Sequence, residues 1–126
     1  MGNITGQFSA TVPGGPALSL KLQIPYQSYD VTSATIAASA ANIDMDVQPS
    51  TTPGDVIFVV VYSDQYGAGL TYKVDGGATA YVLDGPHIMM GGAVAYMNAA
   101  APPQKLTFTS TLTKDANVQV VVGRKS

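Results

Sequence analysis

Residues 4–12 read ITGQFSATV and residues 18–24 read LSLKLQI, and these two stretches decide the fold. In each of them every second residue is apolar or glycine, and the residues between are polar. Successive side chains of a β-strand point to opposite faces of a sheet, so the alternation predicts two strands with one apolar face each. The sequence PGGP at 13–16 breaks the chain between them. We expect each strand to place one face on the core and the other in water or on a neighbouring molecule.

The remaining sequence is divided into similar short stretches. Residues 56–62, VIFVVVY, are apolar throughout, which predicts a central strand that is covered on both faces or lies at a subunit contact. Residues 29–41 are predicted as a strand, and their alanines leave a short helical turn as the alternative. Further strands are predicted at 43–47, 70–74, 78–83, 105–112 and 118–122, and at 87–90, which continues at 93–97 after a break or bulge at Gly91-Gly92.

Turn signals separate these stretches about every 8–12 residues. The sequence DGG at 75–77 predicts a hairpin turn, since these residues tolerate positive φ. About nine or ten short strands at this spacing are typical of an antiparallel sandwich or barrel. We therefore expect residues 1–126 to form one all-β domain, a single antiparallel β-sandwich of jelly-roll or Greek-key type.

Composition supports strands and excludes several classes of protein. The 126 residues include no Glu and one Arg, so the usual residues of exposed helix faces are scarce. The absence of Cys excludes disulfides and thiolate metal sites. Six Lys and Arg against eight Asp give a net charge of −2, which argues against a basic nucleic-acid-binding protein. The longest apolar run, 56–62, is too short for a membrane span. We expect neither a nucleic-acid nor a membrane partner.

One histidine limits the catalytic hypotheses. A Ser-His-Asp triad would need His87 beside a nucleophile and an orienting carboxylate, and Asp84, Ser63 and Ser110 are the candidates. No Gly-x-Ser-x-Gly elbow accompanies them. We interpret His87 as a residue at the edge of a turn, and we expect no enzyme activity and no cofactor.

Two aspartates are the candidate metal ligands. Asp44 and Asp46 lie two residues apart and would share a strand face. A Ca²⁺ site needs six or more oxygen ligands, which Asp30, Asp55 or Asp64 would have to complete. We interpret the pair as solvated carboxylates and expect no metal site.

The tyrosines and the uncharged segment 85–104 point to contacts with other molecules. Seven tyrosines could pack in the core, stack on sugars or lie at protein interfaces. With charged residues at only 11% of the chain, burial of apolar surface in a symmetric oligomer is favoured over a large dry core. The predicted interface residues are Tyr26, Tyr29, Tyr66, Met89, Met90 and Tyr96.

The second half of the chain resembles a known class of proteins. The sequence VDGGATAYVLDGP at 74–86 is followed by an apolar strand, Gly91-Gly92, a Pro-rich loop and VQVVVGR at 118–124. This order, in a short Cys-free chain rich in Thr, Ala, Gly and Val, resembles small all-β virion proteins of tailed bacteriophages, especially capsid decoration or cement proteins. The resemblance covers about residues 55–124 and transfers no functional residue.

The resemblance implies a non-enzymatic structural protein of the virion, assembled in the host cytoplasm. Such proteins bind the capsid lattice as oligomers, often trimers, so we expect a homo-oligomer, with a trimer favoured, and the major capsid protein or another virion protein as partner. Two alternatives remain. One is a phage neck, tail or fibre component, and the other is a carbohydrate-binding β-sandwich with a tyrosine-lined groove near Tyr26, Tyr62 or Tyr66.

Overall fold

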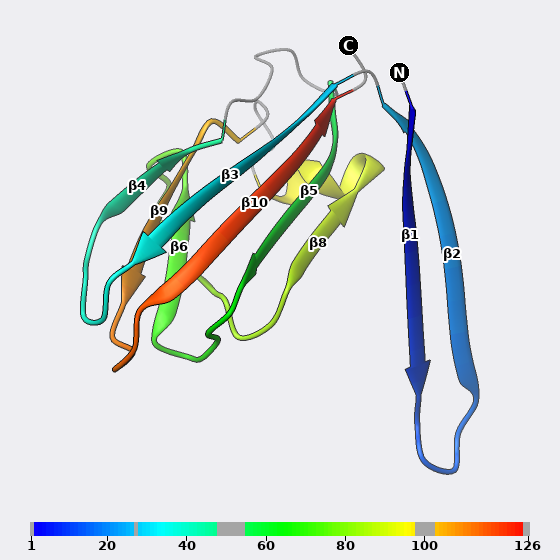
Figure 1. The fold of residues 1–126 in the computed structure, drawn as a ribbon, viewed down its shortest axis with the longest axis horizontal. Coiled ribbons are helices and arrows are strands. Elements are labelled where there is room, and N and C mark those ends of the chain that lie inside the picture. The colour runs from blue at the N-terminus through cyan, green and yellow to red at the C-terminus, as the bar shows by residue number, and fades with distance from the viewer. Residues whose placement is uncertain (1, 27, 48–54, 98–102, 125–126) are drawn as a thin grey trace.

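The computed structural model describes residues 2–26, 28–47, 55–97 and 103–124, and these residues form strands and one short 3₁₀ helix (Figure 1). The elements in chain order are β1 (Gly2–Thr11), β2 (Ala17–Tyr26), β3 (Ser28–Ile36), β4 (Ile43–Asp46), β5 (Val56–Ser63), β6 (Leu70–Val74), β7 (Tyr81–Val82), β8 (His87–Met90), η1 (Gly91–Tyr96), β9 (Lys105–Ser110) and β10 (Ala116–Arg124). The expected all-β class is confirmed.

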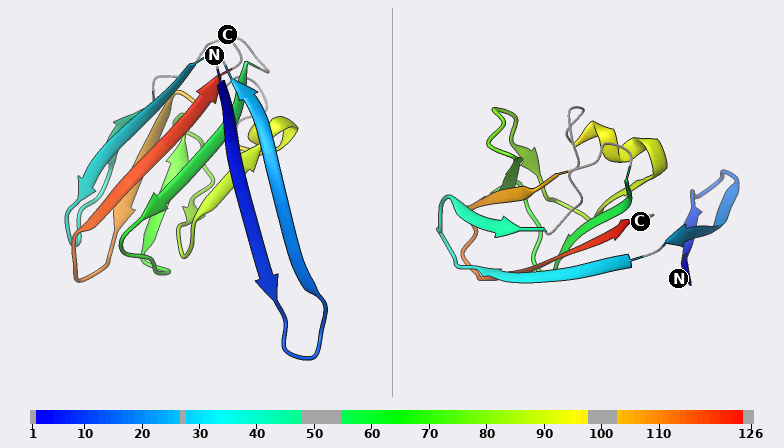
Figure 2. Two further views of the ribbon diagram at one scale, coloured as in Figure 1. Left: turned by 45° about the vertical axis from the view of Figure 1, so that its right-hand side comes forward. Right: turned by 90° about the horizontal axis from the view of Figure 1, so that it is seen from above.

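Two four-stranded antiparallel sheets form a sandwich (Figure 2). One sheet has the strand order β3-β10-β5-β8, and the other has the order β4-β9-β6-β7. Strand β10 pairs with β3 on one side and with β5 on the other, so the end of the chain occupies the middle of its sheet. Strand β5 is thus a central strand, as its continuous apolar sequence predicted, and β10, predicted only as a strand, is the other central strand of this sheet.

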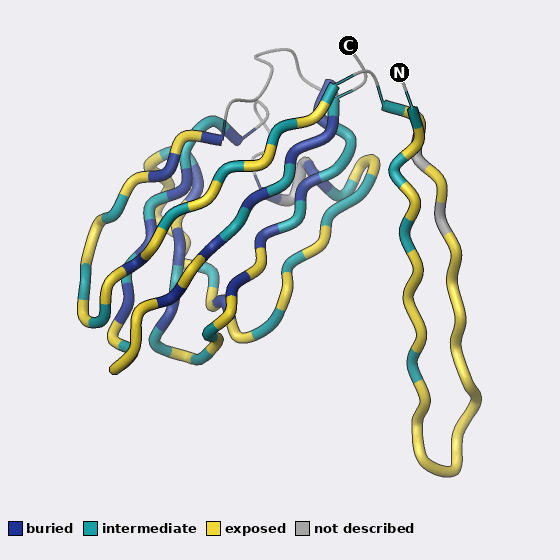
Figure 3. Tube along the Cα trace, viewed as in Figure 1, coloured by how far each residue is buried: buried dark blue, intermediate teal, exposed yellow. Residues whose placement is uncertain are grey.

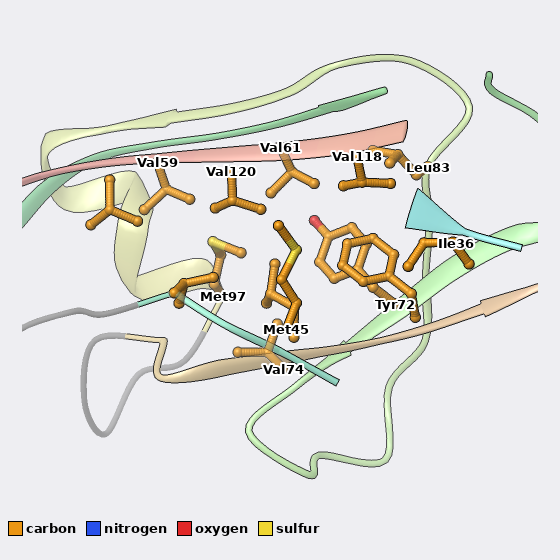
Figure 4. Packing of buried hydrophobic residues seen from close by; sticks show 14 of the residues in the cluster. Ile36, Met45, Val59, Val61, Tyr72, Val74, Leu83, Met97, Val118 and Val120 are labelled. Atoms are coloured by element: carbon orange, nitrogen blue, oxygen red, sulfur yellow. The ribbon is translucent and has the colours of Figure 1, made fainter. Parts of the chain in front are cut away.

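The core lies between the two sheets (Figure 4). Every second residue of β10 points inward, and Val118, Val120 and Val122 are fully buried. Tyr72 on β6 of the other sheet lies opposite Val118 and Val120 (Figure 4). Its ring packs against Phe108 of β9, with ring centroids 5.4 Å apart. Contact between branched aliphatic residues of one sheet and aromatic residues of the other fills the space between two sheets about 10 Å apart.

The third sheet is the hairpin β1–β2, which stands apart from the sandwich (Figures 1 and 3). Its ten backbone pairings run from Gly2↔Tyr26 to Thr11↔Ala17. We call this hairpin, residues Gly2–Tyr26, the arm. Both strands form as predicted, but the expectation that one face lies on the core is wrong. The arm projects away from the sandwich, and its apolar face lies outside the core.

Three further differences from the sequence predictions have local causes. Residues 93–97 were expected as a strand, but 93–96 belong to η1 and Met97 caps its end, because Gly91 turns the chain with a φ of 58° and the amide of Met97 donates to the carbonyl of Val94. The strand predicted at 78–83 is reduced to β7. The strand predicted at 29–41 ends at Ile36, where a turn begins.

The turn at 75–77 is confirmed. Asp75 and Gly76 have φ values of 51° and 72°, and the amide of Gly77 donates to the carbonyl of Val74. The Asp75 carboxylate also accepts hydrogen bonds from the backbone amides of Gln104 and Lys105, both at 2.8 Å. Asp75 therefore fixes both the turn after β6 and the start of β9.

Candidate functional site

The arm has one apolar and one polar face. Its register places Phe8 opposite Leu20 and Ala10 opposite Leu18 on the same face, with Ser9 opposite Ser19 on the other. The side chains of Phe8, Leu18 and Leu20 are 52%, 47% and 45% exposed. A two-stranded hairpin is at best marginally stable in water without packing against another element. The arm thus presents an apolar surface that no part of the described chain covers at these three residues.

A second apolar surface lies on the outer face of the sheet β3-β10-β5-β8. The strand register aligns outward-pointing residues of the four strands into two rows that cross this face. Each strand contributes one apolar residue or glycine to each row. The first row is Tyr29, Gly123, Phe58 and Met90, and the second row is Val31, Val121, Val60 and Ile88. Val31 and Ile88, at the two edges, are each 53% exposed. We call these two rows the outer apolar face.

The base of the arm touches the first row of the outer apolar face, through Tyr26 against Tyr29 at the edge and through Ile4 over Gly123. Gly123 is buried although it lies in the outward row, because Ile4 of β1 covers it. A Cβ atom on Gly123 would lie only 2.7 Å from Cδ1 of Ile4 and 3.3 Å from Cβ of Phe58. The glycine therefore leaves a notch in the sheet that the side chain of Ile4 occupies.

The opposite end of the same outer face is polar. A pocket of about 460 Å³ there includes Ser33, Thr35, Tyr62, Asp64 and Gln119 among its lining residues. The hydroxyl of Tyr62 donates to the side-chain oxygen of Gln119. The lining of this pocket thus combines a tyrosine ring with hydroxyl and amide groups.

Asp64 and Asn117 join β5 to β10 at this polar end. The backbone amide and the side-chain amide of Asn117 each donate to a carboxylate oxygen of Asp64 at 2.8 Å. Both hydrogen bonds lower the pKa of the Asp64 carboxyl, and the bond from the backbone amide has the larger effect. The carboxylate is thereby held in its charged form as a structural clamp.

His87 contacts a tyrosine and no candidate nucleophile. Its Nδ1 lies 2.6 Å from the hydroxyl oxygen of Tyr72, across the interior between the two sheets. Burial raises the pKa of the Tyr72 hydroxyl well above its usual range, and Tyr81 adds to the shift, so this hydroxyl keeps its proton. A pocket of about 390 Å³ beside His87 is lined by Tyr72, Tyr81, Pro86, His87, Ile88, Met89 and Met97.

The serines of the hypothetical triad have other roles. The hydroxyl oxygen of Ser63 accepts a hydrogen bond from the backbone amide of Gln65 at 3.1 Å, in the turn that follows β5. The hydroxyl oxygen of Ser110 accepts one from the backbone amide of Leu112 at 3.1 Å, in the turn that follows β9. Neither serine is hydrogen-bonded to His87. Among the described residues, the structure does not assemble the candidate triad.

The candidate calcium ligands are also dispersed. Asp44 accepts a hydrogen bond from the hydroxyl of Thr107 at 2.8 Å, and Asp30 pairs with Arg124 at 2.5 Å. Asp55 is buried and Asp64 binds Asn117. Within 2–26, 28–47, 55–97 and 103–124, no three His, Cys, Asp or Glu residues gather as a metal site would require.

The predicted interface residues fall in different environments. Tyr29 and Met90 lie in the first row of the outer apolar face, and the ring of Tyr26 contacts that of Tyr29 edge-on, with centroids 5.6 Å apart. Met89 packs against the core. The hydroxyl oxygen of Tyr66 accepts a hydrogen bond from the backbone amide of Ser63. Tyr96 ends η1, and its side chain lies outside the described structure.

Sequence reasoning missed several exposed apolar residues on the strands of the arm and at the sheet edges. They are Phe8, Leu18, Leu20, Val31 and Ile88. The alternation at 4–12 and 18–24 marked three of them as members of an apolar face, but it did not indicate that this face would lie outside the sandwich.

Comparison of the chain with protein-family models, curated proteins and solved structures finds no match. None of the helices in the described part of the chain has the length and apolar character needed to cross a membrane.

Proposed function

We propose that this protein is a non-enzymatic structural protein of a virion, which assembles with further copies and binds the capsid surface to decorate or stabilise it. The observation that carries the proposal is the projecting arm with its uncovered apolar face. Exposed apolar surface on this scale is typical of a protein that functions within an assembly.

The chemistry of the described residues supports assembly over catalysis. Several charged side chains are engaged in structural contacts, such as Asp64 with Asn117 and Asp30 with Arg124. In contrast, Phe8, Leu18 and Leu20 of the arm and Val31 and Ile88 of the outer apolar face are about half exposed. The virion as the place of assembly rests on the sequence resemblance, as does the expected trimer.

Co-sedimentation with capsids tests this function. Capsids purified from the phage that encodes the chain, stripped of the protein, are mixed with increasing amounts of it and pelleted. We expect saturable binding with a fixed number of copies per capsid subunit. An absence of binding at concentrations well above those of the capsid subunits would overturn the proposal.

Carbohydrate binding is the second candidate, and the polar pocket at Tyr62 favours it. Tyr62 lies among Ser33, Thr35 and Gln119, so a sugar could stack on its ring and hydrogen-bond to its neighbours. A glycan array probed with the protein and with Tyr62→Ala tests this candidate. Binding that Tyr62→Ala abolishes would support it, and the absence of any bound glycan would contradict it.

A further inference from the structure

We propose that the apolar face of the arm docks on the outer apolar face of a second copy of this chain. The inference rests on the proposed function, because it names the contact by which the copies assemble. Each copy supplies one arm and one outer apolar face, so every copy can both donate and receive an arm.

The two surfaces match in pattern. On the arm, the pairs Phe8/Leu20 and Ala10/Leu18 lie two residues apart along the strands. On the sheet, the rows through Val121 and Gly123 are also two residues apart. Both repeats are therefore about 6.6–6.8 Å, which allows the side chains of two stacked sheets to interdigitate. No member of these pairs or rows carries a charge, so docking removes no charged group of either surface from water.

The contact between Ile4 and Gly123 shows that arm and sheet fit together. Within one chain the base of the arm covers the first row, at Gly123 through Ile4 and at Tyr29 through Tyr26. Beyond its base the arm leaves the sheet (Figure 2). The second row stays exposed at its two edges, Val31 and Ile88. One residue separates the end of β2 at Tyr26 from the start of β3 at Ser28, which ties the base of the arm to the edge of its own sheet. A second arm is needed to cover the second row.

The area is of the right size for reciprocal exchange. A ten-residue ribbon is about 33 Å long and, with two strands, about 10 Å wide, so one whole face covers up to roughly 350 Å², including the base that lies on its own sheet. In a two-fold dimer both arm contacts fall in one interface, so each copy buries up to roughly 700 Å² there, near the roughly 800 Å² per partner of a stable interface. In a trimer each interface holds one arm contact and buries up to roughly 350 Å² per partner, so the two-fold arrangement fits the area better.

Paired variants on opposite faces of the arm test the donor surface. Phe8→Asp places a charge on the apolar face, and Ser9→Asp places the same charge on the polar face one residue later. Light scattering behind a sizing column gives the mass of each full-length protein. We expect the parent and Ser9→Asp to be oligomeric. We expect Phe8→Asp to weaken association by roughly 30- to 100-fold, the effect of losing one buried aromatic contact.

A second pair tests the acceptor surface. Val31→Asp alters the second row of the outer apolar face, and Ser33→Asp alters the polar end of the same strand. We expect Val31→Asp to weaken association by a similar factor and Ser33→Asp to leave the mass unchanged. Thermal unfolding of each variant at low concentration checks that the sandwich still folds.

Cross-linking tests the contact itself. The chain has no Cys, so Leu20→Cys and Ile88→Cys each introduce one thiol. The two proteins, differing in mass through a tag on one, are mixed and treated with a short bis-maleimide. We expect a mixed dimer of Leu20→Cys and Ile88→Cys to form in preference to either homodimer. A control with Ser19→Cys in place of Leu20→Cys should give little mixed product.

The outcomes separate this inference from the proposed function. An oligomer whose mass is unchanged by both Phe8→Asp and Val31→Asp would overturn the arm contact while leaving capsid binding intact. A parent protein that is monomeric at all concentrations would also overturn it. Arm-dependent oligomers that fail to bind capsids would overturn the proposed function and support the arm contact.

Discussion

The hydroxyl oxygen of Tyr72 lies 2.6 Å from Nδ1 of His87, and this contact connects the two sheets of the sandwich. Tyr72 belongs to β6 and His87 to β8, which are in different sheets. The ring of Tyr72 packs against Phe108, so the same side chain contributes to the apolar core and to a polar bond across it. A histidine that sequence analysis interpreted as a turn-edge residue therefore has a structural partner.

Removing the Tyr72 hydroxyl should lower stability without disturbing the core. We expect Tyr72→Phe to reduce the free energy of unfolding by about 1 kcal/mol, the net value of one hydrogen bond, since the ring remains. Urea denaturation measures the loss. Tyr62→Phe is the matched control, because the bond from Tyr62 to Gln119 lies on the exposed outer face. Equal losses in the two variants would contradict a special role for the bond between the sheets.

The same substitution should have very different effects at the two phenylalanines of the arm and the core. Phe108 is completely buried, so Phe108→Ala should cost about 3–5 kcal/mol of unfolding free energy through lost burial and a cavity. Phe8 is exposed in the single chain, so Phe8→Ala should cost less than about 0.5 kcal/mol in dilute solution. Denaturant unfolding at low protein concentration compares them. A large loss for Phe8→Ala would indicate that the arm packs on its own sandwich.

Acid should weaken the clamp between Asp64 and Asn117. The folded pKa of Asp64 lies below its ordinary value of 3.8, so the clamp stabilises the protein above about pH 4, and this stability is lost as the pH falls through the folded pKa. We expect Asp64→Asn to be less stable than the parent near about pH 6, and this difference to shrink as the pH falls below about 4. Urea unfolding across this range is the measurement. A stability difference that does not change with pH would refute the assignment.

Both the side-chain oxygen of Asp75 and its backbone conformation should contribute to the stability of the fold. Asp75→Ala leaves the amides of Gln104 and Lys105 without this acceptor and places alanine at a φ of 51°. We expect a loss of about 2–3 kcal/mol. Asp75→Asn keeps an acceptor oxygen and a residue type that tolerates positive φ, so it should lose clearly less. Thermal unfolding of the two variants tests this order, and a reversed order would contradict it.

Local patterns in the sequence located the strands well. Alternation marks β1, β2 and β9, and continuous apolar sequence marks β5, because the side-chain period of a strand is a local property. The pattern AVAYM at 93–97 indicated a strand, but this segment forms the end of η1 and its cap. Val94 in η1 and Met97 directly after it are core residues.

Contacts distant in sequence were not predictable in the same way. Alternation in the arm shows that one face must be covered, but not which surface covers it. Nothing local to Asp64 or Asn117 indicates that they meet 53 residues apart. The pairing of Tyr72 with His87 likewise depends on the packing of two sheets, which spacing along the chain does not encode.

The topology also sets an order of folding events. The arm closes through contacts between neighbouring strands, and hairpins of this kind form in about 1–10 μs. The sandwich must bring β3 to β10, with Ser28 and Arg124 meeting across 96 residues of sequence, and such non-local pairing is slow. The arm is also synthesised before the sandwich. The arm can therefore expose its apolar face while the sandwich is still incomplete. At high concentration, nascent chains would then bind one another through their arms before their sandwiches have folded.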